Sequence, residues 1–129
     1  MGEGRPELRV LVVDDDAGIR LLLADVLTEA SCRVFTASDG AEAVEILEAE
    51  PVDLLITDYD MPRMNGLELI RWSQARLPHM TTVMITGHDA QTVRAEGWTC
   101  GALRILQKPF SEEHLLLLVG ELRGAAVTP

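Results

Sequence analysis

Cysteine, positive charge and long apolar runs are all scarce in this chain of 129 residues. The two cysteines, Cys32 and Cys100, are far apart and lack C-x-x-C spacing. We therefore expect free, largely buried thiols in a reducing compartment rather than a metal or redox site. No apolar run approaches the roughly 20 residues that a membrane-spanning helix needs. The opening Met-Gly-Glu-Gly-Arg-Pro-Glu has no apolar signal-peptide core, so we expect a cytoplasmic protein.

Positive charge is outnumbered almost two to one. Eleven Lys and Arg residues face 21 Asp and Glu residues, which gives a net charge of -10. Binding to phosphate groups needs clustered Lys and Arg, so this composition argues against direct binding of nucleic acid or of an anionic membrane. Apolar residues make up 47% of the chain, enough for a folded core, and the length suits one domain.

Strand-like and helix-like segments alternate five times along the chain. We expect strands at about 9–13, 33–37, 53–57, 81–85 and 103–106. We expect helices at about 16–30, 40–50, 66–76, 89–98 and 111–123. The first and third strands are nearly continuous apolar runs, as in parallel strands covered on both faces. Right-handed crossovers then give an α/β fold with a doubly wound parallel sheet.

Two of the helices carry patterns that make specific predictions. The first should bury one face, at the helical spacing of Ile19, Leu22, Leu23, Val26 and Leu27. The last should begin after Ser111 as N-cap and stop at Gly124. It also carries the run Leu115–Val119, which is more than one buried face can hold. We expect some of these leucines to be exposed, either beside a broad core contact or on a surface for a partner or a second copy.

Five polar residues stand at the carboxyl ends of four expected strands: Asp14, Asp15, Asp58, Thr86 and Lys108. In an open parallel sheet these ends meet at one edge, where ligands bind. Three carboxylates so close repel one another unless a cation lies among them. Oxygen ligands of this kind suit Mg²⁺ together with phosphate oxygens. One of the three consecutive aspartates, Asp15 or Asp16, is expected to cap the first helix instead.

The same residues suggest phosphoryl transfer. Asp58 is a candidate nucleophile, because a carboxylate attacks phosphorus to form an aspartyl phosphate. Lys108 and Thr86 would supply a positive charge and a hydroxyl donor to the phosphoryl oxygens. The Lys108–Pro109 bond is compatible with a cis turn that points the lysine into the site. The loop Met61–Gly66 should form one wall of the pocket, with positive φ at the pair Asn65-Gly66.

These motifs together resemble the receiver domain of two-component response regulators. The resemblance rests on Val-Asp-Asp at 13–15, Thr-Asp-Tyr-Asp-Met-Pro-Arg-Met-Asn-Gly at 57–66, Ile-Thr-Gly at 85–87 and Gly-Ala…Lys-Pro-Phe at 101–110. It covers residues 8–123, with 1–7 and 124–129 as flexible termini. It implies a flavodoxin-like sheet of order 2-1-3-4-5 with five helices.

The resemblance also implies roles for single residues. Asp58 would be the phosphoacceptor. Mg²⁺, or Mn²⁺, would be held by the carboxylates of Asp14, Asp15 and Asp58 and by the backbone carbonyl of Asp60. Thr86 and Lys108 would contact the phosphoryl group. The donor would be a histidine kinase or a histidine phosphotransfer protein, and the chain would catalyse only its own phosphorylation and dephosphorylation.

One position departs from the family pattern. Receivers often carry an aromatic residue three positions before the conserved lysine, and Ile105 stands there. We expect Thr86 and the loop after it to bias a partner surface on the helix at 89–98, the last strand and the last helix. Asp60 and His88 are expected to tune the lifetime of the phosphoryl group, although a plain surface histidine is the commoner role. Gly87 should leave the site open to a bulky donor.

Several alternatives stay open. A pseudo-receiver would bind a partner without being phosphorylated. A haloacid-dehalogenase-like phosphatase would use Asp58-Tyr59-Asp60 as its Asp-x-Asp motif, although that family usually has this motif on its first strand. A receiver of this kind acts either alone or within a longer regulator or hybrid kinase, and a homodimer is compatible with either.

Overall fold

The computed structural model describes residues 7–87 and 104–127, with side chains up to residue 122. Five parallel strands form the sheet: β1 (Leu8–Val13), β2 (Cys32–Ala37), β3 (Leu54–Asp58), β4 (Thr81–Thr86) and β5 (Arg104–Gln107). Their order is β2-β1-β3-β4-β5. The predicted fold class and strand order are therefore confirmed.

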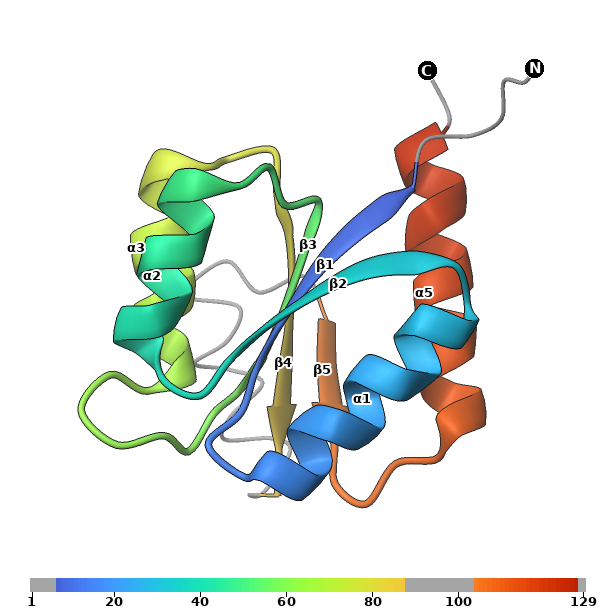
Figure 1. Ribbon diagram of the computed structural model, residues 1–129, viewed down its shortest axis with the longest axis horizontal. Coiled ribbons are helices and arrows are strands. Elements are labelled where there is room, and N and C mark those ends of the chain that lie inside the picture. Colours follow the sequence, from blue (N-terminus) through green and yellow to red (C-terminus); the bar gives the residue numbers. More distant parts are fainter. Residues whose placement is uncertain (1–6, 88–103, 128–129) are drawn as a thin grey trace.

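Helices cover both faces of this sheet. They are α1 (Ala17–Glu29), α2 (Gly40–Ala49), α3 (Gly66–Arg76) and α5 (Glu112–Val127). Figure 1 shows α1 and α5 on one side of the sheet and α2 and α3 on the other. The helix expected at 89–98 lies outside the described residues.

Side-chain alternation in the strands divides the core into two apolar clusters. Successive residues of a strand point to opposite faces. Val10 and Val12 of β1 accordingly pack with residues of α1 and α5, whereas Leu11 and Val13 pack with residues of α2 and α3. All four are at most 1% exposed. The expectation that parallel strands are covered on both faces is confirmed.

Polar side chains fix where the helices begin. Asp16 caps α1, Asp39 caps α2, and Asn65 caps α3 through a reciprocal capping box with Glu68. The Oγ of Ser111 accepts a hydrogen bond of 3.1 Å from the backbone N–H of His114, so its predicted capping role is confirmed. These caps satisfy amide groups that have no partner within their own helix.

Two details of the helices were predicted wrongly. Leu22 is 53% exposed, because α1 contacts the sheet through the narrower stripe of Leu23, Val26 and Leu27. Gly124 does not end the last helix, which continues to Val127. A helical glycine costs only about 1 kcal/mol relative to alanine, and two alanines follow this one in the sequence.

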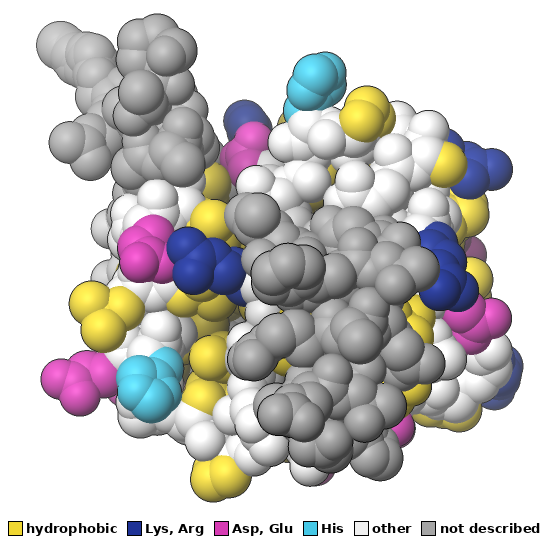
Figure 2. All heavy atoms as spheres, turned by 180° about the vertical axis from the view of Figure 1, so that it is seen from behind, with side chains coloured by type: hydrophobic (Ala, Val, Ile, Leu, Met, Phe, Trp, Pro, Cys, Tyr) yellow, Lys and Arg dark blue, Asp and Glu magenta, His cyan; other side chains and the backbone are white. Residues whose placement is uncertain are grey.

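The leucine run of α5 divides as expected. Leu115, Leu118 and Val119 are buried, whereas Leu116 and Leu117 are 41% and 68% exposed. Figure 2 shows apolar side chains interspersed with charged ones on the α5 side of the molecule. Cys32 is buried and forms no disulfide with another described residue, as predicted, and Cys100 lies outside the described residues. Over the described part of the chain, every helix is too short or too polar to cross a membrane.

Candidate functional site

Three carboxylates meet at the carboxyl edge of the sheet. Asp14 and Asp15 follow β1, and Asp58 is the last residue of β3, the strand beside it. One oxygen from each carboxylate lies within 4.8 Å of the others. Asp14 and Asp58 are 1% and 4% exposed, while Asp15 is exposed. The predicted convergence of these three residues is confirmed.

Asp14 is held on its backbone and on one side of its carboxylate. Its N–H donates to the carbonyl of Ala37 at 3.2 Å, and its carbonyl accepts from the Arg20 guanidinium at 2.7 Å. Its Oδ1 accepts from the N–H of Asp16 at 2.9 Å. Its Oδ2 is buried and has no hydrogen-bond partner within the described structure. A buried carboxylate oxygen without a partner is costly, and a cation would satisfy it.

Asp16 is the member of the aspartate run that serves the helix. Its Oδ1 accepts from the backbone N–H groups of Gly18 and Ile19 at 2.8 and 3.2 Å. This confirms that one of the three aspartates caps α1, and it leaves Asp14 and Asp15 for the pocket.

Lys108 reaches the same pocket from the other side. Its Nζ lies 3.0 Å from Oδ1 of Asp58, and its backbone N–H donates to the carbonyl of Thr86 at 2.7 Å. Thr86 ends β4, two strands from β1, and its side chain is buried. The Lys108–Pro109 peptide bond is cis, as the sequence allowed.

Burial and charge shift the pKa values of the pocket. Burial raises the pKa of Asp14, the hydrogen bond from Asp16 offsets part of this rise, and the charge of Asp58 adds to it. Burial also raises the pKa of Asp58, against the opposing hydrogen bond and charge of Lys108. For Lys108, burial would lower the pKa, but the hydrogen bond and charge of Asp58 outweigh it and raise the pKa. The pocket therefore carries excess negative charge that its own lysine does not neutralise.

The loop after β3 forms the wall of the pocket, as predicted. A shallow hollow there is lined by Asp15, Tyr59, Asp60, Met61, Pro62 and Asn65. The predicted positive φ at Asn65-Gly66 is wrong: Arg63 has φ 70°, and Asn65 is extended as the N-cap of α3. Glycine is needed at position 66 because of a close backbone contact and not because of a positive φ. A Cβ there would lie 2.5 Å from the carbonyl oxygen of Asp58.

The remaining predicted residues differ in exposure and packing. Gly87 is exposed, and a Cβ at this position would meet no heavy atom within 4 Å in the described structure. Ile105 is half-buried and packs on the apolar cluster beneath α2 and α3. Asp60 and Pro109 are exposed, and His88 lies outside the described residues. The sequence did not predict the contact of Arg20 with the pocket. The one indication of it was the position of Arg20, one helical turn after the aspartates.

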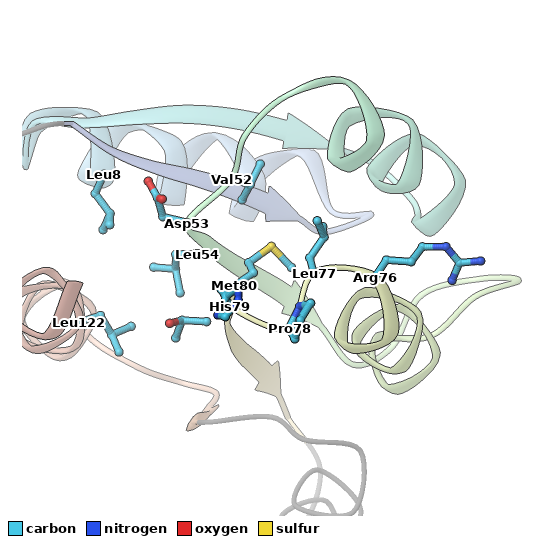
Figure 3. Close-up of a pocket in the computed structure, with 11 residues that line it drawn as sticks. Leu8, Val52, Asp53, Leu54, Arg76, Leu77, Pro78, His79, Met80 and Leu122 are labelled. Atoms are coloured by element: carbon cyan, nitrogen blue, oxygen red, sulfur yellow. The ribbon is translucent and has the colours of Figure 1, made fainter. Parts of the chain in front are cut away.

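A second hollow, of about 550 Å³, lies at the opposite edge of the sheet and is shown in Figure 3. It is lined by Leu8, Val52, Asp53, Leu54, Arg76, Leu77, Pro78, His79, Met80, Thr81 and Leu122. The lining contains one carboxylate, Asp53, which already accepts a hydrogen bond of 2.8 Å from the N–H of Arg9. Of these two hollows, the one at the carboxyl edge of the sheet is therefore the one that lies beside a cluster of carboxylates.

Comparison with known proteins decides the family. The family model of the response regulator receiver domain matches residues 10–120. The chain belongs to the response regulator receiver family. Response regulator MprA of Mycobacterium ulcerans is 37% identical to this receiver over 109 residues, which cover 84% of the chain and 47% of MprA. The receiver thus spans about half the length of the curated relatives it matches.

Solved structures agree with this assignment. The chemotaxis protein CheY4 of Vibrio cholerae is similar at a TM-score of 0.86 and 31% identity, covering 91% of this receiver and 99% of CheY4. A CheY-like receiver domain protein of Methanospirillum hungatei JF-1 is similar at a TM-score of 0.88 and 27% identity, covering 93% and 96% of the two chains. The family match favours a receiver over the haloacid-dehalogenase-like phosphatase weighed from the sequence.

Proposed function

We propose that this receiver accepts a phosphoryl group on Asp58 from a phosphohistidine of a histidine kinase or a histidine phosphotransfer protein. The observation that carries the proposal is the ion pair of 3.0 Å between Lys108 and Asp58 beside the buried carboxylate of Asp14. Response regulators as a family pair with histidine kinases.

The proposed transfer is a direct displacement at phosphorus. A carboxylate oxygen of Asp58 forms a bond to phosphorus while the bond from phosphorus to the donor imidazole nitrogen breaks. The imidazole leaves with the electron pair and takes a proton. Lys108 would neutralise charge on the phosphoryl oxygens, and the Thr86 hydroxyl would donate to one of them. The product is an acyl phosphate, which water slowly hydrolyses to regenerate Asp58.

A divalent cation fits the acidic pocket. The ligands we propose are the carboxylates of Asp14, Asp15 and Asp58 and the backbone carbonyl of Asp60. All are oxygen donors, which suits Mg²⁺ and also Mn²⁺. When bound, the cation would neutralise the carboxylates and the phosphoryl oxygens. The support is the buried Oδ2 of Asp14, which has no partner within the described structure.

The output of the switch is proposed at the surface of the helix expected at 89–98, β5 and α5. Its described part carries the exposed leucines 116 and 117 and an ion pair of 3.1 Å between Arg104 and Glu121. Ile105 excludes a switch gated by an aromatic ring at that position, so movement of Thr86 would bias this surface by itself. A downstream protein or a second copy of the chain would bind there.

Other properties follow as proposals. The receiver would not turn over a separate substrate, and it would act in the cytoplasm without binding nucleic acid directly. Asp60 and His88 would adjust the lifetime of the acyl phosphate, and Gly87 would admit the donor. Its net charge of -10 supports the absence of direct nucleic acid binding.

Intact-mass spectrometry tests the proposal. The receiver is incubated with a small phosphodonor in Mg²⁺, and parallel samples contain a chelator or the variant Asp58→Asn. We expect a gain of one phosphoryl group in the parent in Mg²⁺ and none in the other two samples. The matched control is Asp25→Asn, which removes an exposed carboxylate of α1 and should still gain the group. If the small donor and a phosphorylated histidine phosphotransfer protein both fail, the chain is a pseudo-receiver.

A further inference from the structure

Arg20 lies in the first turn of α1 and points back at the acidic pocket. It is half-buried, and its Nη1 donates to the backbone carbonyl of Asp14 at 2.7 Å. A hydrogen bond from a charged group is stronger than one between neutral groups. Arg20 thus binds the backbone of Asp14, whose side chain is the most buried of the three carboxylates.

This contact completes the fixation of Asp14. Its N–H is tied to β2 through Ala37, its Oδ1 to the N–H of Asp16, and its carbonyl to Arg20. Asp16 is fixed in turn by capping α1 and by accepting from the backbone N–H of Arg20 at 3.0 Å. After these bonds, Oδ2 is the carboxylate oxygen left without a partner, and it is buried.

We infer that Arg20 is a positioning residue for the divalent cation site. By holding the carbonyl of Asp14, it fixes the turn between β1 and α1 so that the Asp14 carboxylate stays in the cluster with Asp15 and Asp58. Groups that orient a metal ligand typically change metal affinity by 10- to 100-fold. The inference deepens the proposed function, because it rests on a cation binding to Asp14, Asp15 and Asp58.

Charge and positioning predict opposite effects of removing Arg20. A guanidinium near the pocket repels a cation, so deleting its charge alone should make cation binding tighter. Loss of the hydrogen bond should loosen Asp14 and leave its carbonyl poorly satisfied, which should make binding weaker. The direction of the change therefore separates the two roles.

Titration of the full chain with Mn²⁺, followed by the electron paramagnetic resonance signal of the free ion, measures this directly. We expect Arg20→Met to raise the Kd for Mn²⁺ about tenfold. Arg20→Lys keeps the charge without the planar fork of donors and should raise the Kd roughly threefold. The matched control is Arg71→Met, which removes one exposed positive charge on α3 and should leave the Kd unchanged.

The Mn²⁺ titrations can contradict the role of Arg20 without contradicting the proposed cation site. If the parent binds Mn²⁺ and Arg20→Met binds it equally well or more tightly, the inference is overturned while the cation site stands. If Arg20→Met does not fold in a urea titration, Arg20→Lys decides, and a Kd equal to the parent's overturns the inference. If the parent does not bind Mn²⁺, or Asp14→Asn binds as well as the parent, the proposed cation site itself fails and the role of Arg20 falls with it.

Discussion

Single residues in the pocket are arranged for binding rather than for stability. Asp14 is 1% exposed, carries a raised pKa, and has one carboxylate oxygen without a partner in the described structure. Asp58 is buried beside it and also has a raised pKa. Burying a charge without full pairing costs free energy. The pocket should therefore lower the free energy of unfolding until a cation is present.

The variant Asp14→Asn tests this cost. Asparagine keeps an acceptor for the N–H of Asp16, removes one buried charge, and can donate to a neighbouring carboxylate. We expect it to raise the free energy of unfolding by about 1 to 3 kcal/mol at pH 7 in chelator. Urea titrations of both proteins measure the difference. A variant less stable than the parent under these conditions would show that Asp14 is satisfied in the cation-free protein.

The pH dependence has a definite sign. Asp14 and Asp58 have folded-state pKa values above the ordinary 3.8, so the folded protein holds their protons more tightly than the unfolded chain. Their contribution is most favourable below about pH 4 and is lost as the pH rises through the raised values. In chelator, the gain from Asp14→Asn should consequently shrink toward zero as the pH falls to 4. A gain that is constant between pH 7 and pH 4 would contradict this.

Among the elements of the fold, the loop between β3 and α3 packs closely against the end of β3. A Cβ at Gly66 would lie 2.5 Å from the Asp58 carbonyl oxygen and 3.0 Å from the Cα of Tyr59. Both are backbone atoms, so a side chain at this position must displace the loop or the strand. The first residue of α3 thereby controls where Asp58 sits.

Two glycine-to-alanine changes in helices should act in opposite directions. We expect Gly66→Ala to lower the free energy of unfolding by about 1 to 3 kcal/mol, because it overpacks a close backbone contact. Gly120→Ala in α5 has open space around its Cβ and should raise it by about 0.5 to 1 kcal/mol. Urea titrations compare them with the parent. If Gly66→Ala is as stable as Gly120→Ala, the close approach to Asp58 does not exist in solution.

The sequence predicted most elements because its patterns are local. Apolar runs, capping residues and the residues at the strand ends place the sheet, α3 and the pocket correctly. The features that the sequence missed at Leu22, Gly66 and Arg20 depend on tertiary contacts. Exposure of Leu22 depends on how α1 is rotated against the sheet, and the constraint on Gly66 comes from a strand eight residues earlier in the chain. The hydrogen bond from Arg20 to the carbonyl of Asp14 likewise forms only when α1 packs against the sheet.

For the whole molecule, the net charge of -10 and the acidic pocket make the same qualitative prediction, that cations stabilise the fold. The two effects differ in whether they depend on the identity of the cation. A bound cation stabilises the native state by about 2.7 kcal/mol when its concentration is 100 times its Kd, whereas screening depends only on ionic strength. We expect Mg²⁺ to raise the Tm by several degrees more than NaCl at equal ionic strength. Asp14→Asn should respond equally to both salts, and an equal response in the parent would argue against a specific site.

Mapping the modified residue decides whether Asp58 is the phosphoacceptor. The receiver is phosphorylated in Mg²⁺ and treated with borohydride, which reduces an aspartyl phosphate to homoserine, and the digested chain is sequenced by mass spectrometry. We expect homoserine at position 58 alone, and none when a chelator is present. Homoserine at position 14, 15 or 60, or phosphorylation that yields no homoserine, would contradict the assignment of Asp58 as the phosphoacceptor.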